Sequence, residues 1–252
     1  MIAHAGLIGE RAHGRRPANP LRLALHGALA VLAVATTAPA AAQVGAAVSV
    51  FSDARFRGYS LSSRHPVASL DLSFDRSEGA YAAASASIVA STADGLQPLG
   101  LQLNGGYARK LSPELTLDVG ITHSNYARYS SRGRANSYTE AYVGLRHKFL
   151  TSRVYLSPHY FHAGTWTVYG ELDGDVSPAR KLHLIGHVGA LTPLRRGGNT
   201  TPTSFDWRIG VSRELGPVSL QLAWTGVRSA HYQAPNGARD QSRLIFGLSC
   251  PL

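Results

Sequence analysis

The sequence contains little that could crosslink the chain or bind a metal through sulfur. Cysteine occurs once, at position 250, and methionine also occurs once in 252 residues. A single thiol cannot form an intramolecular disulfide, and it cannot provide a cysteine-based metal site. We therefore interpret Cys250 as a small apolar side chain near the end of the chain.

The sequence also lacks an apolar segment long enough for a membrane-spanning helix, which needs about 20 residues. The apolar stretch at residues 27–35 falls well short of that length and follows several arginines. Small residues follow it at positions 38–42, as at the cleavage site of a secretory signal peptide. We predict a signal peptide at residues 1–42 and one mature domain at residues 43–252.

Charged residues are scarce at 16%, although basic residues outnumber acidic ones and give a formal net charge of +10. Nucleic-acid binding would require that the basic residues form a concentrated patch. Here the arginines are distributed among segments between apolar stretches, and the predicted signal peptide directs the chain out of the cytoplasm. We therefore expect no nucleic-acid partner.

The rest of the chain alternates apolar and polar residues almost throughout, with no sustained helical period. In residues 115–122 and 218–225, every second residue is Leu, Val, Ile or Trp. Such alternation is typical of strands with one apolar face. Twelve runs of this kind can be drawn, at residues 44–52, 66–75, 80–91, 98–109, 114–125, 137–149, 152–162, 165–175, 180–191, 203–213, 216–227 and 240–250.

The length of these runs indicates a membrane protein. Most have 10–13 residues, which suits a tilted membrane-spanning strand of about 9–11 residues. Strands of soluble sheets are usually shorter, about 5–6 residues. A bilayer offers no water to unpaired backbone groups, so a chain without spanning helices must close its sheet.

The connections between the runs mostly alternate between long and short, as in outer-membrane barrels with short periplasmic turns. The connection at 161–165 is an exception, because it is short where a long one is due. We predict an all-β fold: a transmembrane antiparallel up-and-down β-barrel of about 12 strands, in the outer membrane of a Gram-negative bacterium. An even number of strands places both ends of the barrel in the periplasm.

Four segments carry a resemblance to a known family: SDARFRG at 52–58 with Ser60, YTEAYVG at 138–144, LSPHYF at 156–161 and DWRIGV at 206–211. In order and spacing they resemble the TorF-type porins, a bacterial family of unknown function also called Gcw-chp. The resemblance implies a signal-bearing outer-membrane barrel with a transport role. Two features depart from the family pattern, because His123-Ser124 replaces an expected tyrosine and the terminal aromatic residue is missing.

The charged residues Asp53, Arg55 and Arg57 form the most distinctive candidate site. Residues two apart on a strand point the same way, so all three are expected to line the lumen or its rim. They form either a charged constriction that selects solutes or an internal ion-pair network that stabilises a polar interior.

Further polar residues are expected in the lumen because they alternate with apolar ones. Glu140 shares a face with Tyr138, Tyr142 and Arg146, and Asp206 shares a face with Arg208. Four more acidic residues can join them: Asp71, Asp118, Glu171 and Asp173. A mixed-charge interior tunes the ion preference of an open pore, and it equally suits a closed structural barrel.

We expect no metal site and no cofactor. His183 and His187 share a face, but four residues along a strand span about 13 Å. Zinc–nitrogen bonds of about 2 Å cannot bridge that gap, although pairing across strands leaves open another arrangement. No Gly-x-Ser-x-Gly motif or other catalytic signature is present, so we predict that the protein is not an enzyme.

The leading functional hypothesis is a porin for passive passage of small hydrophilic solutes. The alternatives are a structural or adhesive surface barrel without conductance, and an outer-membrane enzyme acting on lipids. Expected partners are outer-membrane lipids, lipopolysaccharide and the barrel-assembly machinery. Arginines in the long connections can contact lipopolysaccharide phosphates or attract anions, or can be merely solvated: Arg128, Arg132, Arg134, Arg195, Arg196, Arg228 and Arg239.

Overall fold

The computed structural model describes residues 42–93, 95–127, 136–161, 166–194, 203–228 and 242–252. Twelve long strands form one closed sheet, and the predicted all-β barrel is confirmed. They are β1 (Ala42–Phe51), β4 (Val67–Arg76), β5 (Ala80–Ser91), β6 (Gly95–Lys110), β7 (Leu115–Tyr126), β8 (Asn136–His147), β9 (Leu150–Ser157), β10 (Trp166–Ala179), β11 (Leu182–Leu194), β12 (Ser204–Leu215), β13 (Val218–Arg228) and β14 (Arg243–Pro251). In this part of the chain, no helix has the length and apolar character needed to span a membrane.

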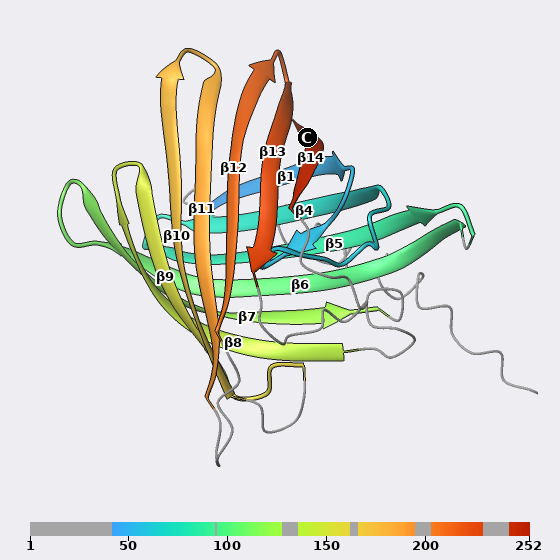
Figure 1. Cartoon of the computed structure of the whole chain (residues 1–252). Coiled ribbons are helices and arrows are strands. Elements are labelled where there is room, and N and C mark those ends of the chain that lie inside the picture. The colour runs from blue at the N-terminus through green and yellow to red at the C-terminus, as the bar shows by residue number, and fades with distance from the viewer. Residues whose placement is uncertain (1–41, 94, 128–135, 162–165, 195–202, 229–241) are drawn as a thin grey trace, which may run out of the picture. The chain divides into compact units, whose positions relative to one another are not determined.

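Each strand pairs with the next one along the chain in antiparallel fashion, and the first strand closes on the last (Figure 1). Val48 on β1 lies opposite Cys250 on β14, and opposite Leu70 on β4 at its other edge. Both ends of the barrel chain therefore lie at the same end of the cylinder. Closure pairs every strand on both sides, which is what a bilayer without water requires.

The outer face of the barrel is apolar. Alternate positions carry large exposed hydrophobic side chains; Ile209 is 68% exposed and Val188 is 54% exposed. Their sequence neighbours, Arg208 and His187, point into the barrel and line its cavities. The alternation in sequence thus becomes a lipid-facing belt around a polar interior.

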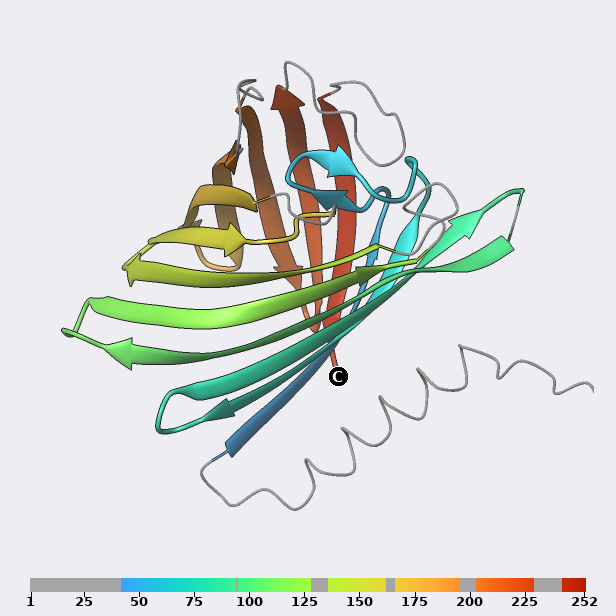
Figure 2. The ribbon, with the colours of Figure 1, turned by 90° about the horizontal axis from the view of Figure 1, so that it is seen from below.

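The connection between β1 and β4 contains a small hairpin that the alternation does not predict. Its strands are β2 (Arg55–Phe56) and β3 (Tyr59–Ser60). Figure 2 shows this hairpin inside the ring of long strands. Phe56 packs against two buried clusters, one of Leu61, Val67, Val89 and Leu99 and the other of Tyr138, Tyr160, Tyr169 and Leu191. The hairpin and these clusters therefore fill part of the barrel interior.

Strand boundaries differ from the prediction at several places. For example, β10 continues to Ala179, where the prediction ends the strand at 175. The run predicted at 152–162 ends as a strand at Ser157, and residues 158–161 are irregular. Pro158 has no backbone N–H to continue the ladder, and Phe161 adopts a positive φ of 56°. The turn between β8 and β9 also falls earlier than predicted, at residues 148–149, where Lys148 has a φ of 51°.

Candidate functional site: the lumen of the barrel

Two of the cavities in the lumen share part of their lining. The hairpin cavity, beside β2 and β3, has a volume of about 660 Å³. The turn-side cavity, near the short β8–β9 turn, has a volume of about 500 Å³. Arg208 and Gln221 line both cavities. The interior space therefore extends from the hairpin toward the short turns.

The hairpin is organised around the carboxylate of Asp53, which is 3% exposed. Asp53 accepts hydrogen bonds from Arg55 Nε at 2.9 Å and from the hydroxyls of Ser60 at 2.5 Å and Ser62 at 2.8 Å. Three donors on one carboxylate fix the path of the whole connection. Asp53 and Arg55 thus form a local ion pair inside the lumen.

The tip of the hairpin is a two-residue turn formed by Arg57 and Gly58, with φ angles of 48° and 78°. Positive φ at both positions is the signature of a type I′ turn, which matches the twist of the flanking strands. A Cβ on Gly58 would come within 2.7 Å of the backbone oxygen of Gly226 on β13, so glycine is required by space as well. The tip of the hairpin therefore packs closely against β13 in the barrel wall.

Arg57 joins the hairpin to the opposite side of the lumen. Its Nη2 donates to both carboxylate oxygens of Glu140 on β8 at 2.7 Å, and both side chains are almost fully buried. The guanidinium also lies 3.9 Å from the ring centre of Tyr169 and 5.1 Å from that of Tyr160. A charge at this depth needs its partner, because removing one member of a buried pair costs about 3–5 kcal/mol.

A second network crosses strands β10, β11 and β12. His187 contacts Asp173 through Nδ1 at 2.8 Å and Asp206 through Nε2 at 2.9 Å. The Tyr169 hydroxyl donates to both carboxylate oxygens of Asp206 at 3.2 Å. Because Tyr169 also stacks on Arg57, this network continues into the hairpin contact.

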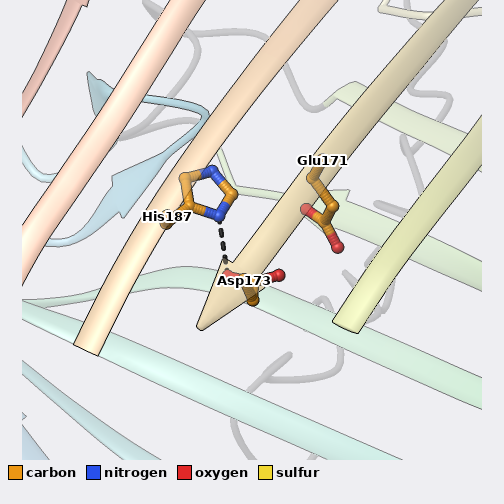
Figure 3. Close-up of side chains that lie close together, drawn as sticks. All are labelled: Glu171, Asp173 and His187. Atoms are coloured by element: carbon orange, nitrogen blue, oxygen red, sulfur yellow. Dashed lines mark hydrogen bonds and ion pairs between the residues drawn. The ribbon is translucent and has the colours of Figure 1, made fainter. Parts of the chain in front are cut away.

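The side chains of Glu171, Asp173 and His187 gather within this network (Figure 3). Their candidate ligand atoms lie within 4.8 Å of one another, so pairing across strands does bring oxygen and nitrogen donors together. The same groups already engage each other and the wall, since Glu171 also accepts the Tyr155 hydroxyl at 2.8 Å. We therefore treat the group as part of the ion-pair network. His183 is separate and contacts Asp175 and Glu214.

A third network links β5, β7, β8 and β9. Arg153 donates to Asp118 from Nε at 3.1 Å and from Nη2 at 3.0 Å. The Tyr81 hydroxyl donates to the same carboxylate at 2.5 Å and also contacts the hydroxyl of Tyr142. Arg153 lies 3.9 Å from Glu171, which connects this network to the second one.

The structure places the seven residues expected in the lumen as follows. Six line the hairpin cavity: Asp53, Arg55, Arg57, Glu140, Asp206 and Arg208. Arg146 lines the turn-side cavity together with Arg208. The expectation that Asp53, Arg55 and Arg57 share one strand is wrong, because Asp53 precedes β2 and Arg57 lies in the turn after it. The pairs Arg55–Asp53 and Arg57–Glu140 form an internal ion-pair network there.

Alternation and motifs alone do not single out Tyr169 and Arg153 as lumen residues, and they suggest for His187 only a possible role as a metal ligand. These residues are recognised only once the register between strands is known. Asp173 lies directly opposite His187, and Glu171 lies opposite Arg153. Among the arginines expected in the long connections, Arg228 is the exposed last residue of β13. The remaining ones lie outside the described residues.

Comparisons with solved structures agree with the architecture. The fold is similar to that of the NanC porin, with 14% identity, 82% of this chain and 100% of that chain covered, and a TM-score of 0.53. The KdgM porin in complex with disordered oligogalacturonate has 11% identity, 82% and 98% coverage and a TM-score of 0.48. LpxR from Salmonella typhimurium has 11% identity, 82% and 99% coverage and a TM-score of 0.41. At these identities the similarity shows the fold alone.

A comparison with curated protein sequences gives no match. A family model does match, and its match extends over residues 35–244, which includes most of the barrel. The segments that carry the resemblance noted in the sequence, from residue 52 to residue 211, all lie within this match. The chain therefore belongs to the Gcw_chp family, described as bacterial proteins of unknown function.

Proposed function

We propose that this barrel is a porin that lets small hydrophilic solutes diffuse passively across the outer membrane. The observation that supports the proposal is that adjoining cavities with charged and polar lining residues lie along the lumen. The hairpin cavity and the turn-side cavity both lie in the lumen, and Arg208 and Gln221 line both of them. Polar side chains at both levels can replace part of the hydration shell of a passing solute.

The side of the lumen away from the ion-pair networks favours passage. It is lined by small or neutral polar side chains, among them Ser69, Ser87, Gln102 and Asn104. Asn104 donates to Thr122 at 2.7 Å, so these groups bond to their neighbours along the wall. Small side chains leave room next to the hairpin.

Conductance across a planar bilayer tests the proposal directly. We expect the purified protein to insert and give stable single-channel current steps, and the same sample denatured by heat serves as the control. If the protein gives no current steps although circular dichroism shows that it is folded, passive transport is refuted. A parallel assay of phospholipid turnover checks the expectation that the barrel is not a lipid-active enzyme.

A specific observation favours one rival, a structural surface barrel without conductance. The hairpin folds into the lumen and is fixed there by the buried Arg57–Glu140 pair. If the hairpin closes the lumen, the wild-type protein will be silent, whereas Glu140→Gln will conduct once the hairpin is released. If the hairpin only narrows the lumen, both proteins will conduct.

We further propose that the hairpin forms the constriction, with Arg55 as its charged side chain. Arg55 lines the hairpin cavity, and part of its side chain is exposed there. Arg55→Ala should change the ratio of anion to cation permeability measured from reversal potentials. An unchanged ratio would remove Arg55 from the selectivity of the pore.

The partners expected outside the barrel remain predictions. The apolar belt, with residues such as Ile209 and Val188, supports direct contact with outer-membrane lipids. Contact with lipopolysaccharide and with the barrel-assembly machinery is proposed from the barrel type. Enrichment in the outer-membrane fraction of cells, and assembly defects when that machinery is depleted, are the measurements that check these expectations.

A further inference from the structure

Most charged groups around the turn-side cavity are already paired. Asp173 contacts His187, and Asp175 contacts His183. Lys148, at the β8–β9 turn, contacts Glu114. Each acidic side chain that lines the cavity, and one of its cations, therefore has a partner.

Arg146 and Arg208 are the exceptions. Both are exposed, both line the turn-side cavity, and neither makes an ion pair or side-chain hydrogen bond within the described part of the chain. A guanidinium is charged at any physiological pH and carries five N–H donors. The cavity therefore presents two fixed positive charges whose donors are available to a solute. Asp71, which accepts from Ser69, lines a different cavity.

The register places these two arginines on one row of the barrel wall. Along this row, opposite residues run from Arg146 through Thr151, Asp173 and His187 to Arg208. Side chains on one row of paired strands point to the same face of the sheet, here the lumen. The two arginines thus lie on either side of the Asp173–His187 pair in this row. The carboxylate of Asp173, which lies between them, is already bonded to His187.

The cavity has the size and chemistry of a small-molecule site. Its volume of about 500 Å³ lies within the range of about 300–1,000 Å³ that is typical of ligand pockets. Arginine binds a carboxylate through two parallel N–H donors, a geometry that adds specificity to charge attraction. Neutral polar side chains of Thr151, Ser177 and Gln221 on the same lining can bond to hydroxyl groups of the solute.

We propose that the turn-side cavity is a binding site for small carboxylate-bearing solutes, with Arg146 and Arg208 supplying the guanidiniums. This inference rests on the proposed porin function, and it names the class of solute that the pore favours. A solute held there would cross the end of the lumen that faces the predicted periplasm. Weak binding at exposed arginines suits a pore, because a solute must also leave.

Block of single-channel current tests the site. Succinate should reduce the open-channel current of the wild type in a concentration-dependent manner, whereas uncharged erythritol at the same concentration should not. Each arginine contributes charged hydrogen bonds, so we expect roughly tenfold weaker block by succinate in Arg146→Gln and in Arg208→Gln. The double variant should show almost none, and inorganic phosphate in place of succinate separates carboxylate recognition from attraction of any oxyanion.

Arg213→Gln is the matched control, because Arg213 is on β12 like Arg208 but does not line either lumen cavity. It lies opposite Leu220, which faces the exterior. This variant removes the same charge and should leave block by succinate unchanged. Equal block in the control and in the Arg146→Gln/Arg208→Gln double variant would overturn the proposal.

Failure of the pore and failure of the site can be distinguished by calorimetric titration of the detergent-solubilised protein with succinate. If the wild type does not conduct but binds succinate, and the double variant binds roughly tenfold or more weakly, the site stands and only the porin function fails. If the wild type conducts but shows neither block nor binding, the carboxylate site is wrong and the porin function stands. Circular dichroism of each variant checks that the barrel is folded.

Discussion

The two sides of the barrel interior differ in what their inward-facing side chains contact. On the side formed by β7 to β12, charged and tyrosine side chains bridge several strands, as in the contacts of His187 with Asp173 and Asp206. On the side formed by β1, β4 to β6, β13 and β14, many contacts join small neighbours, such as the hydroxyls of Ser49 and Ser249 at 2.8 Å. Tyr81 on β5, which bonds to Asp118, is an exception. We call the two sides the charged wall and the small wall.

This difference separates two tasks of the interior. The charged wall fixes the hairpin, because Arg57 contacts Glu140 on β8 and stacks on Tyr169 on β10. The small wall leaves more space, because many of its inward-facing side chains are small, among them Ser49, Ser69 and Ser87. A barrel of twelve strands lies between small barrels with a packed interior and large barrels with an open channel. Here the charged wall resembles the packed kind, and the small wall resembles the open kind.

The largest effect is expected from breaking the contact between the hairpin and the charged wall. Glu140→Gln removes the charge that compensates Arg57 while keeping the size of the side chain. Both partners are almost fully buried, so we expect a loss of about 3–5 kcal/mol in the free energy of unfolding. Urea unfolding in detergent micelles, followed by tryptophan fluorescence, measures it.

A double substitution sharpens this test. Arg57→Met with Glu140→Leu removes both charges and fills the site with apolar atoms next to the rings of Tyr169 and Tyr160. Replacing a buried ion pair in this way is often neutral or stabilising. The double variant should therefore recover most of the stability lost in Glu140→Gln. Equal instability of the two variants would show that packing, rather than an uncompensated charge, fixes the hairpin.

A smaller effect is expected within the charged wall itself. His187→Gln keeps a hydrogen-bonding side chain but cannot bridge Asp173 and Asp206 as a cation does. His187 is 12% exposed in its side chain, so water can compensate part of the loss. We expect about 1–3 kcal/mol of destabilisation in the same urea assay. A loss as large as that of Glu140→Gln would mean that the two networks act as one unit.

The twelve long strands were predictable because a strand that separates lipid from water must alternate. Residues 218–225 show that alternation, and they lie in β13 as predicted. The hairpin was not predictable in this way, because β2 and β3 have two residues each and carry no period. Its place depends on Arg57 contacting a glutamate 83 positions away, a pairing that only the closed barrel creates.

The same reasoning explains which parts of the lumen the sequence revealed. The inward direction of Glu140, Asp206 and Arg208 follows from alternation alone. Their partners depend on register between strands, and a shift of one residue would change every opposite pair. Asp173 opposite His187 is such a case. The sequence alone therefore identified the charges but not which of them neutralise each other.

The smallest effect is expected on the small wall. Ser49→Ala removes one hydroxyl from the pair with Ser249, which links β1 to β14 where the barrel closes. The remaining Ser249 hydroxyl can turn toward lumen water, so we expect only about 0.5–1.5 kcal/mol of destabilisation in urea. Ser49→Ala, Ser249→Ala and the double variant form a cycle that isolates the pair. If Ser49→Ala costs as much as Glu140→Gln, the closing seam rather than the charged wall limits the stability of the barrel, and the division between the two walls fails.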